Sequence, residues 1–241
     1  DISSTFGQIN FAAAYFAMMS ILCLGLGLAS RATPARIGWL LATAAMVFIA
    51  ARTTSMQGPL AFAAGILAFA VAGALAYRGK HRRLLVAAML CAAVVGLIVG
   101  LLGLVGNGPL GFVGRDANTV WRFAVWSAGW ETMIGHPLVG IGTGNFARYI
   151  SEFRPLDTVA VTGESMRPSA VHNIPLQFGI VGGWPALLMW VGTFVGAITL
   201  LLVRLAKKPV ASTWLGAGVA GALAAYLVQA GLTLRLLLVL L

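Results

Sequence analysis

The chain has 241 residues, of which 60% are hydrophobic and 9% are charged, and its formal net charge is +10 at pH 7. A soluble domain has about 25% charged residues, so this composition excludes a soluble globular protein and indicates an integral membrane protein. The net charge alone would suggest a nucleic-acid-binding protein, but the basic residues flank apolar runs and form no soluble basic module. Contact with anionic lipid headgroups accounts for most of them.

Apolar runs long enough, or nearly long enough, to cross a bilayer as helices are spread along the chain. We predict about six spans, at 9–29, 37–51, 59–77, 84–106, 174–203 and 213–234. The second is short, so we expect it to be tilted, kinked or continued by its neighbours. The predicted fold class is therefore all-α, a polytopic integral membrane protein. Since the chain begins at Asp1 without methionine or a visible signal peptide, we expect it to be part of a longer protein.

Charge predicts the orientation of these spans. Three short connections carry basic residues and no acid, and all six acids fall in other segments. By the positive-inside rule the basic connections face the cytoplasm, and the loop of about 65 residues between the fourth and fifth spans faces the opposite side, in a bacterium the periplasm. We therefore divide the chain into membrane helices at 1–106, a periplasmic loop at 107–173 and C-terminal membrane helices at 174–241. The basic residues concerned are Arg31, Arg36, Arg78, Lys80, Arg82, Arg83, Arg204, Lys207 and Lys208.

The long loop has two recognisable parts. Its segment 120–133 has the apolar spacing of a helix, and Trp121, Trp126 and Trp130 predict that this helix lies at the membrane interface, at headgroup level. The segment 135–146 has alternating glycines, which predict a tight turn where backbone approaches backbone or a ligand.

Polar residues that could carry chemistry gather at the outer ends of the spans and in the loop, which predicts an outward-facing polar site. Arg52 and Arg122 offer planar, bidentate donors suited to phosphate, or they reach lipid headgroups as snorkelling side chains. Arg115 is as well placed for a local pair with Asp116 as for a site role. The full set on this side is Gln8, Asn10, Arg52, Thr53, Thr54, Ser55, Gln57, Arg115, Arg122, His172, Asn173 and Gln177.

His172 stands where the loop re-enters the membrane, and an imidazole there can transfer a proton near neutral pH. The alternative is a histidine with only structural hydrogen bonds at a helix start. We expect His136, in a Gly-His-Pro turn, to be structural and His81 to contact headgroups. No cysteine cluster, histidine pair or acidic cluster predicts a metal site, and Cys23 and Cys91 lie in apolar runs as packing residues.

Three segments carry recognisable motifs. The segment 6–12 contains Gly-x-x-Asn before a span. The segment 122–146 runs from Arg-x-x-x-Trp to Pro-Leu-x-Gly-x-Gly-x-Gly-x-Phe, and the segment 172–183 contains His-Asn-x-x-Leu-Gln followed by Gly-Gly. Together these motifs resemble those of the O-antigen ligase and polymerase superfamily of bacterial envelope glycosyltransferases. Family members commonly have more spans than we count, which favours a missing N-terminal portion.

The resemblance implies a glycosyltransferase that carries O-antigen glycan from undecaprenyl diphosphate to the lipid A core at the periplasmic face of the inner membrane. It implies no cofactor and no metal, with His172 as the catalytic histidine and Arg52 and Arg122 as ligands of the donor diphosphate. Supporting roles then fall to Gln8, Asn10, Arg115, Asn173 and Gln177.

Two alternatives remain open. An O-antigen polymerase or a protein O-oligosaccharyltransferase would use the same donor, although Val181 stands where these enzymes often have an acid. A transporter of lipid-linked anionic sugars belongs to another class, and it would need polar residues through the depth of the membrane. The deep span positions here are almost all apolar, which favours an enzyme at the outer face.

Overall fold

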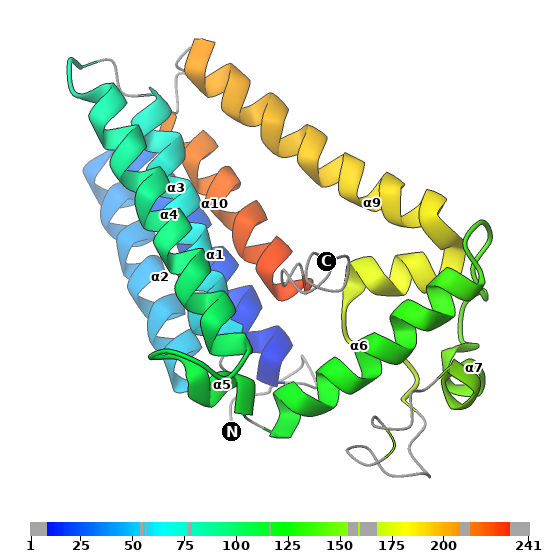
Figure 1. Cartoon of the computed structure of the whole chain (residues 1–241). Coiled ribbons are helices and arrows are strands. Elements are labelled where there is room, and N and C mark those ends of the chain that lie inside the picture. The colour runs from blue at the N-terminus through cyan, green and yellow to red at the C-terminus, as the bar shows by residue number, and fades with distance from the viewer. Residues whose placement is uncertain are drawn as a thin grey trace. The chain divides into compact units, whose positions relative to one another are not determined.

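A computed structural model of the chain describes residues 9–53, 55, 57–76, 79–115, 117–153, 159, 168–207 and 213–231. Over these residues the regular structure is entirely α-helical, which confirms the predicted fold class (Figure 1). The chain forms two compact units, each with its own apolar core. Unit 1 comprises residues 1–94 and 196–229, and unit 2 comprises residues 95–195 and 230–241.

Unit 1 is built on α1 (Ile9–Ala29), α2 (Thr33–Arg52), α3 (Gln57–Ala76) and α10 (Thr213–Gln229). Helices α1, α3 and α10 pack against one another, and α2 packs against α1 (Figure 1). Glycines set the close spacing, since a Cβ on Gly25 would lie 2.7 Å from the Trp214 carbonyl oxygen and one on Gly65 would lie 2.8 Å from that of Gly221. Small residues at such contacts are typical of helices that pack inside membranes.

Five helices are long and apolar enough to cross a membrane: α1, α2, α3, α4 (Arg82–Leu104) and α9 (Ile174–Lys207). They correspond to the first five predicted spans. The short second span, predicted to begin at residue 37, is extended at its N-terminal end. Helix α2 begins at Thr33, with Pro34 in its first turn, where proline is well tolerated. Its 20 residues rise about 30 Å, enough for the hydrocarbon core.

The sixth predicted span is shorter than expected. Helix α10 has 17 residues and ends at Gln229, at the short limit for a spanning helix. Gly231, two residues later, has a φ of +93°, in the left-handed region that ends helices. The predicted end at 234 lies outside the described residues.

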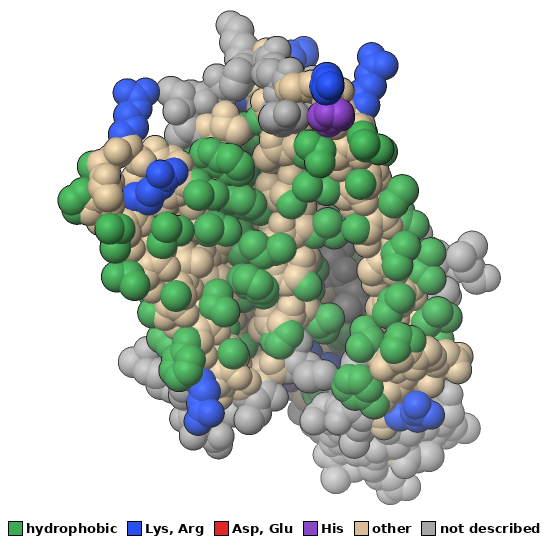
Figure 2. Space-filling view, turned by 90° about the vertical axis from the view of Figure 1, so that its left-hand side faces the viewer, with side chains coloured by type: hydrophobic (Ala, Val, Ile, Leu, Met, Phe, Trp, Pro, Cys, Tyr) green, Lys and Arg blue, Asp and Glu red, His purple; other side chains and the backbone are tan. Residues whose placement is uncertain are grey.

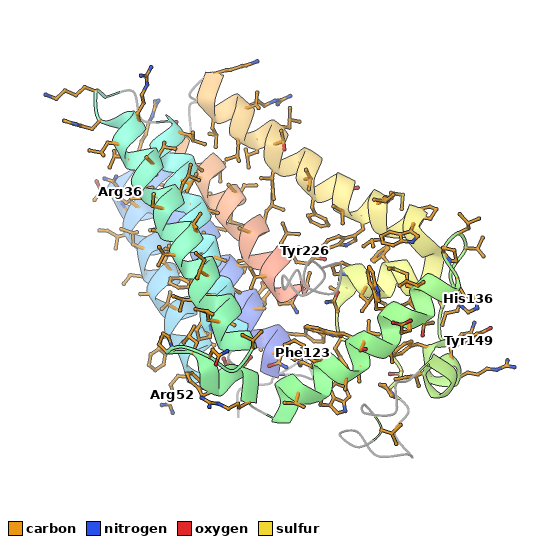
Figure 3. The ribbon with its side chains drawn as sticks, in the orientation of Figure 1. Arg36, Arg52, Phe123, His136, Tyr149 and Tyr226 are labelled. Carbon is orange, nitrogen blue, oxygen red and sulfur yellow. The ribbon has the colours of Figure 1, made fainter. Side chains whose placement is uncertain are left out.

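Antiparallel packing in unit 1 brings together the helix ends that flank the three basic connections. Gly25 of α1 and Gly73 of α3 both lie against Trp214 at the start of α10, so the ends of α1 and α3 meet the beginning of α10. Arg36 and Arg52 stand at opposite ends of α2 (Figure 3). On the face of unit 1 that Figure 2 shows, Lys and Arg side chains bound a broad apolar surface. Such a surface suits lipid contact, as the prediction of membrane spans requires.

Unit 2 contains α5 (Gly111–Arg115), α6 (Ala117–Gly135), α7 (Phe146–Phe153) and the start of α9. Helix α6 confirms the helix predicted at 120–133. The tryptophans, expected as headgroup markers, all have partners inside the unit. Trp130 is 8% exposed and its ring meets that of Trp184 edge-on at 5.8 Å. The indole N–H of Trp126 donates to the Val171 carbonyl oxygen at 2.7 Å, and Trp121 lies beside His172.

Helix α9 is broken, which the predicted continuous fifth span did not anticipate. Gly182 has φ −131° and ψ 17°, and Gly183 has φ +69° and ψ −167°, so the helical path stops after Val181 and restarts at Trp184. Pro185 suits the restart, since proline is tolerated in the first turn of a helix. The first segment (174–181) and the long second segment (184–207) are therefore separate helices in their backbone geometry.

The glycine-rich turn at 137–142 is hydrogen-bonded to the backbone on both sides of the break in α9. Ile141 N–H donates to the Ile180 carbonyl oxygen at 2.8 Å, Gly142 N–H donates to that of Val181 at 3.1 Å, and Trp184 N–H donates to that of Pro137 at 2.8 Å. The turn thus supplies hydrogen-bond partners for backbone N–H and C=O groups that lose their helical partners at the break. The predicted approach of backbone to backbone is confirmed.

Candidate active site

His172 lies in the non-helical stretch 168–173 that leads into the first segment of α9. Its φ is +54°, the one positive value at a non-glycine residue among those described. A left-handed backbone costs a residue with a Cβ roughly 1–2 kcal/mol, so neighbouring groups must hold it in place.

Asn173, the next residue, holds the link from one side. Its side-chain oxygen accepts the Leu176 N–H at 3.0 Å, which makes Asn173 the N-cap of α9. Its side-chain NH₂ donates to the Gly231 carbonyl oxygen at 2.8 Å, and Ile174 N–H donates to that of Ala230 at 2.8 Å. The turn after α10 is therefore bonded directly to the residues that follow His172.

Val171, the preceding residue, is held from the other side. Its N–H donates to the side-chain oxygen of Gln177 at 3.1 Å, and its carbonyl oxygen accepts the indole N–H of Trp126 at 2.7 Å. Asn173 and Gln177, predicted as supporting residues, thus bind the backbone on both sides of His172. This double clamp presents the imidazole in one backbone conformation.

The imidazole itself is exposed and lies beside one aromatic residue of α6. Its ring centre lies 5.7 Å from that of Trp121, with the planes tilted by 49°. Partial burial and, second, the positive charge of Arg122 lower the pKa of His172 below 6.5. At neutral pH the ring is therefore uncharged and able to accept a proton.

Arg122, the residue after Trp121 on α6, is half-buried, and its charge acts on His172. Burial lowers the pKa of Arg122 from its ordinary value, but arginine keeps its charge near pH 7. A partly buried guanidinium favours an anion as its neighbour. Unit 2 therefore holds a half-buried guanidinium whose charge acts on the imidazole of His172.

The other predicted site residues have separate surroundings. Arg115 donates from Nε to the Gly111 carbonyl oxygen at 3.2 Å, within α5, and Asp116 lies outside the described residues. In unit 1, Arg52 is exposed in the last turn of α2. At the same end of that unit, the Ser55 hydroxyl donates to the side-chain oxygen of Asn10 at 2.6 Å. Gln8 lies outside the described residues.

His136 has the structural surroundings that we expected. Its Nδ1 lies 3.1 Å from the Thr132 carbonyl oxygen at the end of α6, and its ring meets Tyr149 edge-on at 5.2 Å (Figure 3). Among the described residues, no group of three or more His, Cys, Asp or Glu is arranged to hold a metal.

Sequence reasoning missed two contributors to the site. Trp121 was noted only as an interfacial aromatic, although its position next to Arg122 on α6 places it beside His172. Gly231 stands just after an apolar run, where glycine often ends a helix, so the sequence did indicate a turn there. Its contact with Asn173 joins residues 58 positions apart and had no signal in the sequence.

Comparison with known proteins decides the family. A family model described as O-antigen ligase matches residues 21–191, which is more than half of the chain. The chain belongs to the O-antigen ligase family. This confirms the resemblance found in the sequence. A search of the curated proteins found no match.

Membership of the O-antigen ligase family gives the coarse function. The chain is a multi-pass membrane enzyme of the O-antigen ligase or polymerase type, with glycosyltransferase-like activity on lipid-linked glycans. This favours the enzyme over the transporter. The matched range includes Arg52, Arg122 and His172, whereas the turn at Ala230 and Gly231 lies beyond it.

Proposed function

We propose that this member of the O-antigen ligase family transfers O-antigen glycan from undecaprenyl diphosphate to the lipid A core oligosaccharide. The reaction takes place at the periplasmic face of the bacterial inner membrane, inverts the anomeric centre and needs no metal. The loop at 107–173 carries catalytic elements, and the segments 1–106 and 174–241 form the membrane helices. The observation that carries the proposal is His172, clamped on both sides and kept neutral beside Arg122.

The chemistry is displacement at the anomeric carbon. An acceptor hydroxyl of the lipid A core attacks that carbon, and the bond from the carbon to the diphosphate oxygen breaks. Undecaprenyl diphosphate leaves with the bonding electrons, and neutral His172 accepts the proton of the hydroxyl. Attack opposite the leaving group inverts the centre. Base catalysis of this kind contributes about 10²- to 10⁴-fold to the rate.

Most negative charge develops on the leaving diphosphate. We assign Arg122 and Arg52 to this group, because fixed guanidinium groups stabilise such charge without a metal. Arg122 then has a second effect. While its charge is uncompensated it lowers the pKa of His172, and a bound diphosphate offsets that charge. His172 therefore becomes the stronger base once the donor is bound.

The supporting residues divide into two kinds. Asn173 and Gln177 position His172 through its neighbouring backbone. Asn10 belongs with Ser55 at the Arg52 end of unit 1, where neutral polar groups accompany the arginine. We also propose supporting roles for Gln8 and for Arg115, whose Nε donates within α5.

A reconstituted transfer assay tests the proposal, and the control variant changes a second arginine of the same helix, α2. Purified protein in lipid nanodiscs is given undecaprenyl-diphosphate-linked glycan and lipid A core, and the wild type is expected to form glycosylated lipid A core. Arg52→Lys should lose at least about tenfold in rate, because an ammonium lacks the bidentate geometry of a guanidinium. Arg36→Lys, at the other end of α2, should retain the wild-type rate.

Three outcomes would count against the proposal. If the wild type extends free glycan repeats or modifies a peptide and leaves lipid A core unmodified, the polymerase or the protein O-oligosaccharyltransferase replaces the ligase. If none of the three acceptors is used, the proposed reaction fails. Equal rates for Arg52→Lys and the wild type would remove Arg52 from the donor site.

A further inference from the structure

The turn between α6 and α7 exposes two adjacent aliphatic side chains. Leu138 is 74% exposed and Val139 is 79% exposed, more than any other large hydrophobic residue among those described. The surrounding stretch 134–147 contains no Lys, Arg, Asp or Glu. A loop on the aqueous side of a membrane protein has no evident reason to display such a pair unless something apolar covers it.

Backbone hydrogen bonds hold this tip away from the core of unit 2. Trp184 N–H donates to the Pro137 carbonyl oxygen at 2.8 Å just before the pair. Just after the pair, Gly140 N–H donates to the His136 carbonyl oxygen at 3.1 Å, and Ile141 N–H donates to the Ile180 carbonyl oxygen at 2.8 Å. Since both flanks are bonded, Leu138 and Val139 have little freedom to fold back onto the protein.

The same bonds place the tip relative to the lipid-facing helix. Trp184 begins the long second segment of α9, and Arg204 lies 20 residues later in its last turn. This separation corresponds to about 30 Å along the helix, which is the thickness of a bilayer's hydrocarbon core. Arg204 and Lys207 suit the headgroups at one boundary, so Trp184 lies at the other.

Apolar surface continues from the tip onto this helix. Leu188 and Met189, one turn beyond Trp184, are 63% and 67% exposed on a segment that is long and apolar enough to cross a membrane. Pro137 is bonded to Trp184 itself, so the turn and the start of the lipid-facing segment share one depth. Lipid is therefore the apolar medium nearest to Leu138 and Val139.

We propose that the tip formed by Leu138 and Val139 inserts into the acyl chains of the adjacent leaflet and anchors the turn at the membrane surface. The occupant is the bilayer itself. The glycines around the tip allow the turn to be bonded to α9 on one side and immersed in lipid on the other. This inference does not depend on which glycan or acceptor the enzyme uses.

Fluorescence in nanodiscs tests the insertion. In a background with Cys23→Ala and Cys91→Ser, Val139→Cys is labelled with an environment-sensitive fluorophore, and a second variant, Leu138→Cys, repeats the measurement. The control is Thr143→Cys, an exposed residue of the same turn flanked by Gly142 and Gly144. We expect blue-shifted emission at positions 138 and 139, and quenching by lipids with brominated acyl chains at least about threefold stronger than at position 143, because contact with lipid places the fluorophore among the acyl chains.

Each contrary result identifies a different error. Emission and quenching equal to those at position 143 would show that the tip lies in water and would overturn the proposal. Blue-shifted emission that brominated lipids leave unquenched would also overturn it, because protein, and not lipid, would then cover the tip. If that signal depended on the number of chains in each nanodisc, the cover would be a second copy of the chain.

Discussion

Replacing His172 by alanine is expected to lower the rate of glycan transfer by about 10²- to 10⁴-fold, the contribution that a general base makes. The loss should fall on kcat, because the imidazole accepts a proton only as the acceptor hydroxyl attacks. Donor binding should change little, since Arg122 and Arg52 remain. The measurement is steady-state transfer by purified wild-type and variant protein in nanodiscs.

A folding defect would imitate this result, so a matched histidine is needed. His136→Ala removes a ring that contacts Thr132 and Tyr149 and that lies outside the proposed chemistry. It should lower thermal stability by about 1 kcal/mol, the usual value of one hydrogen bond, and leave kcat near that of the wild type. Near-normal turnover by a well-folded His172→Ala protein would end the assignment of His172 as the base.

Gly140→Ala is expected to have the largest effect on stability. Gly140 has a φ of +62°, and an added Cβ would overlap the backbone carbonyl groups of Ile180 and Val181. The left-handed conformation costs an alanine roughly 1–2 kcal/mol, and the overlap adds about 1–3 kcal/mol. The backbone hydrogen bonds from the turn to Ile180 and Val181 would be lost. The first segment of α9, which follows His172, would then no longer be held by the turn.

Gly144→Ala separates these two costs. Gly144 also has a positive φ, of +77°, but no atom lies within 4 Å of its added Cβ, so only the conformational strain applies. Thermal unfolding followed by tryptophan fluorescence suits the comparison, because Trp130 and Trp184 meet beside the break. Equal stabilities for the two variants would contradict the account of the turn as a partner of α9.

The helices of unit 1 could be predicted because each is a single apolar run. The limits of α1, at Ile9 and Ala29, agree with the sequence prediction. The start of α2 was missed because Thr33, Pro34 and Arg36 are not apolar, although proline fits a first helical turn. Hydrophobicity predicts where lipid contact occurs, whereas helix ends depend on local backbone chemistry.

The break in α9 had a weaker signal. Glycine pairs are common in membrane helices, so Gly182 and Gly183 do not by themselves predict a break. What stabilises it is the turn at 137–142, about forty positions earlier in the chain, whose backbone bonds have no side-chain signature. The resemblance pointed to both segments without indicating that they bind each other.

For the candidate site, the resemblance indicated residues but not the contacts that hold them. The resemblance selected His172 and Arg122, and the structure places both in unit 2, with the charge of Arg122 acting on the imidazole. The left-handed backbone of His172 and the clamp from Trp126 and Gly231 are long-range features. Spacing along the chain carries no information about such contacts.

The acid side of the pH profile tests the central claim, that neutral His172 is the base beside Arg122, most directly. The quantity to measure is kcat/KM for transfer between about pH 5 and pH 8, because it reports the pKa of the free enzyme. Only the neutral ring accepts a proton, so activity should fall as pH drops through the pKa of His172. Burial and Arg122 lower that pKa, so the fall should come below pH 6.5, and Arg122→Gln should move it to higher pH. A profile without an acid fall, or a fall that stays in place in Arg122→Gln, would contradict the claim.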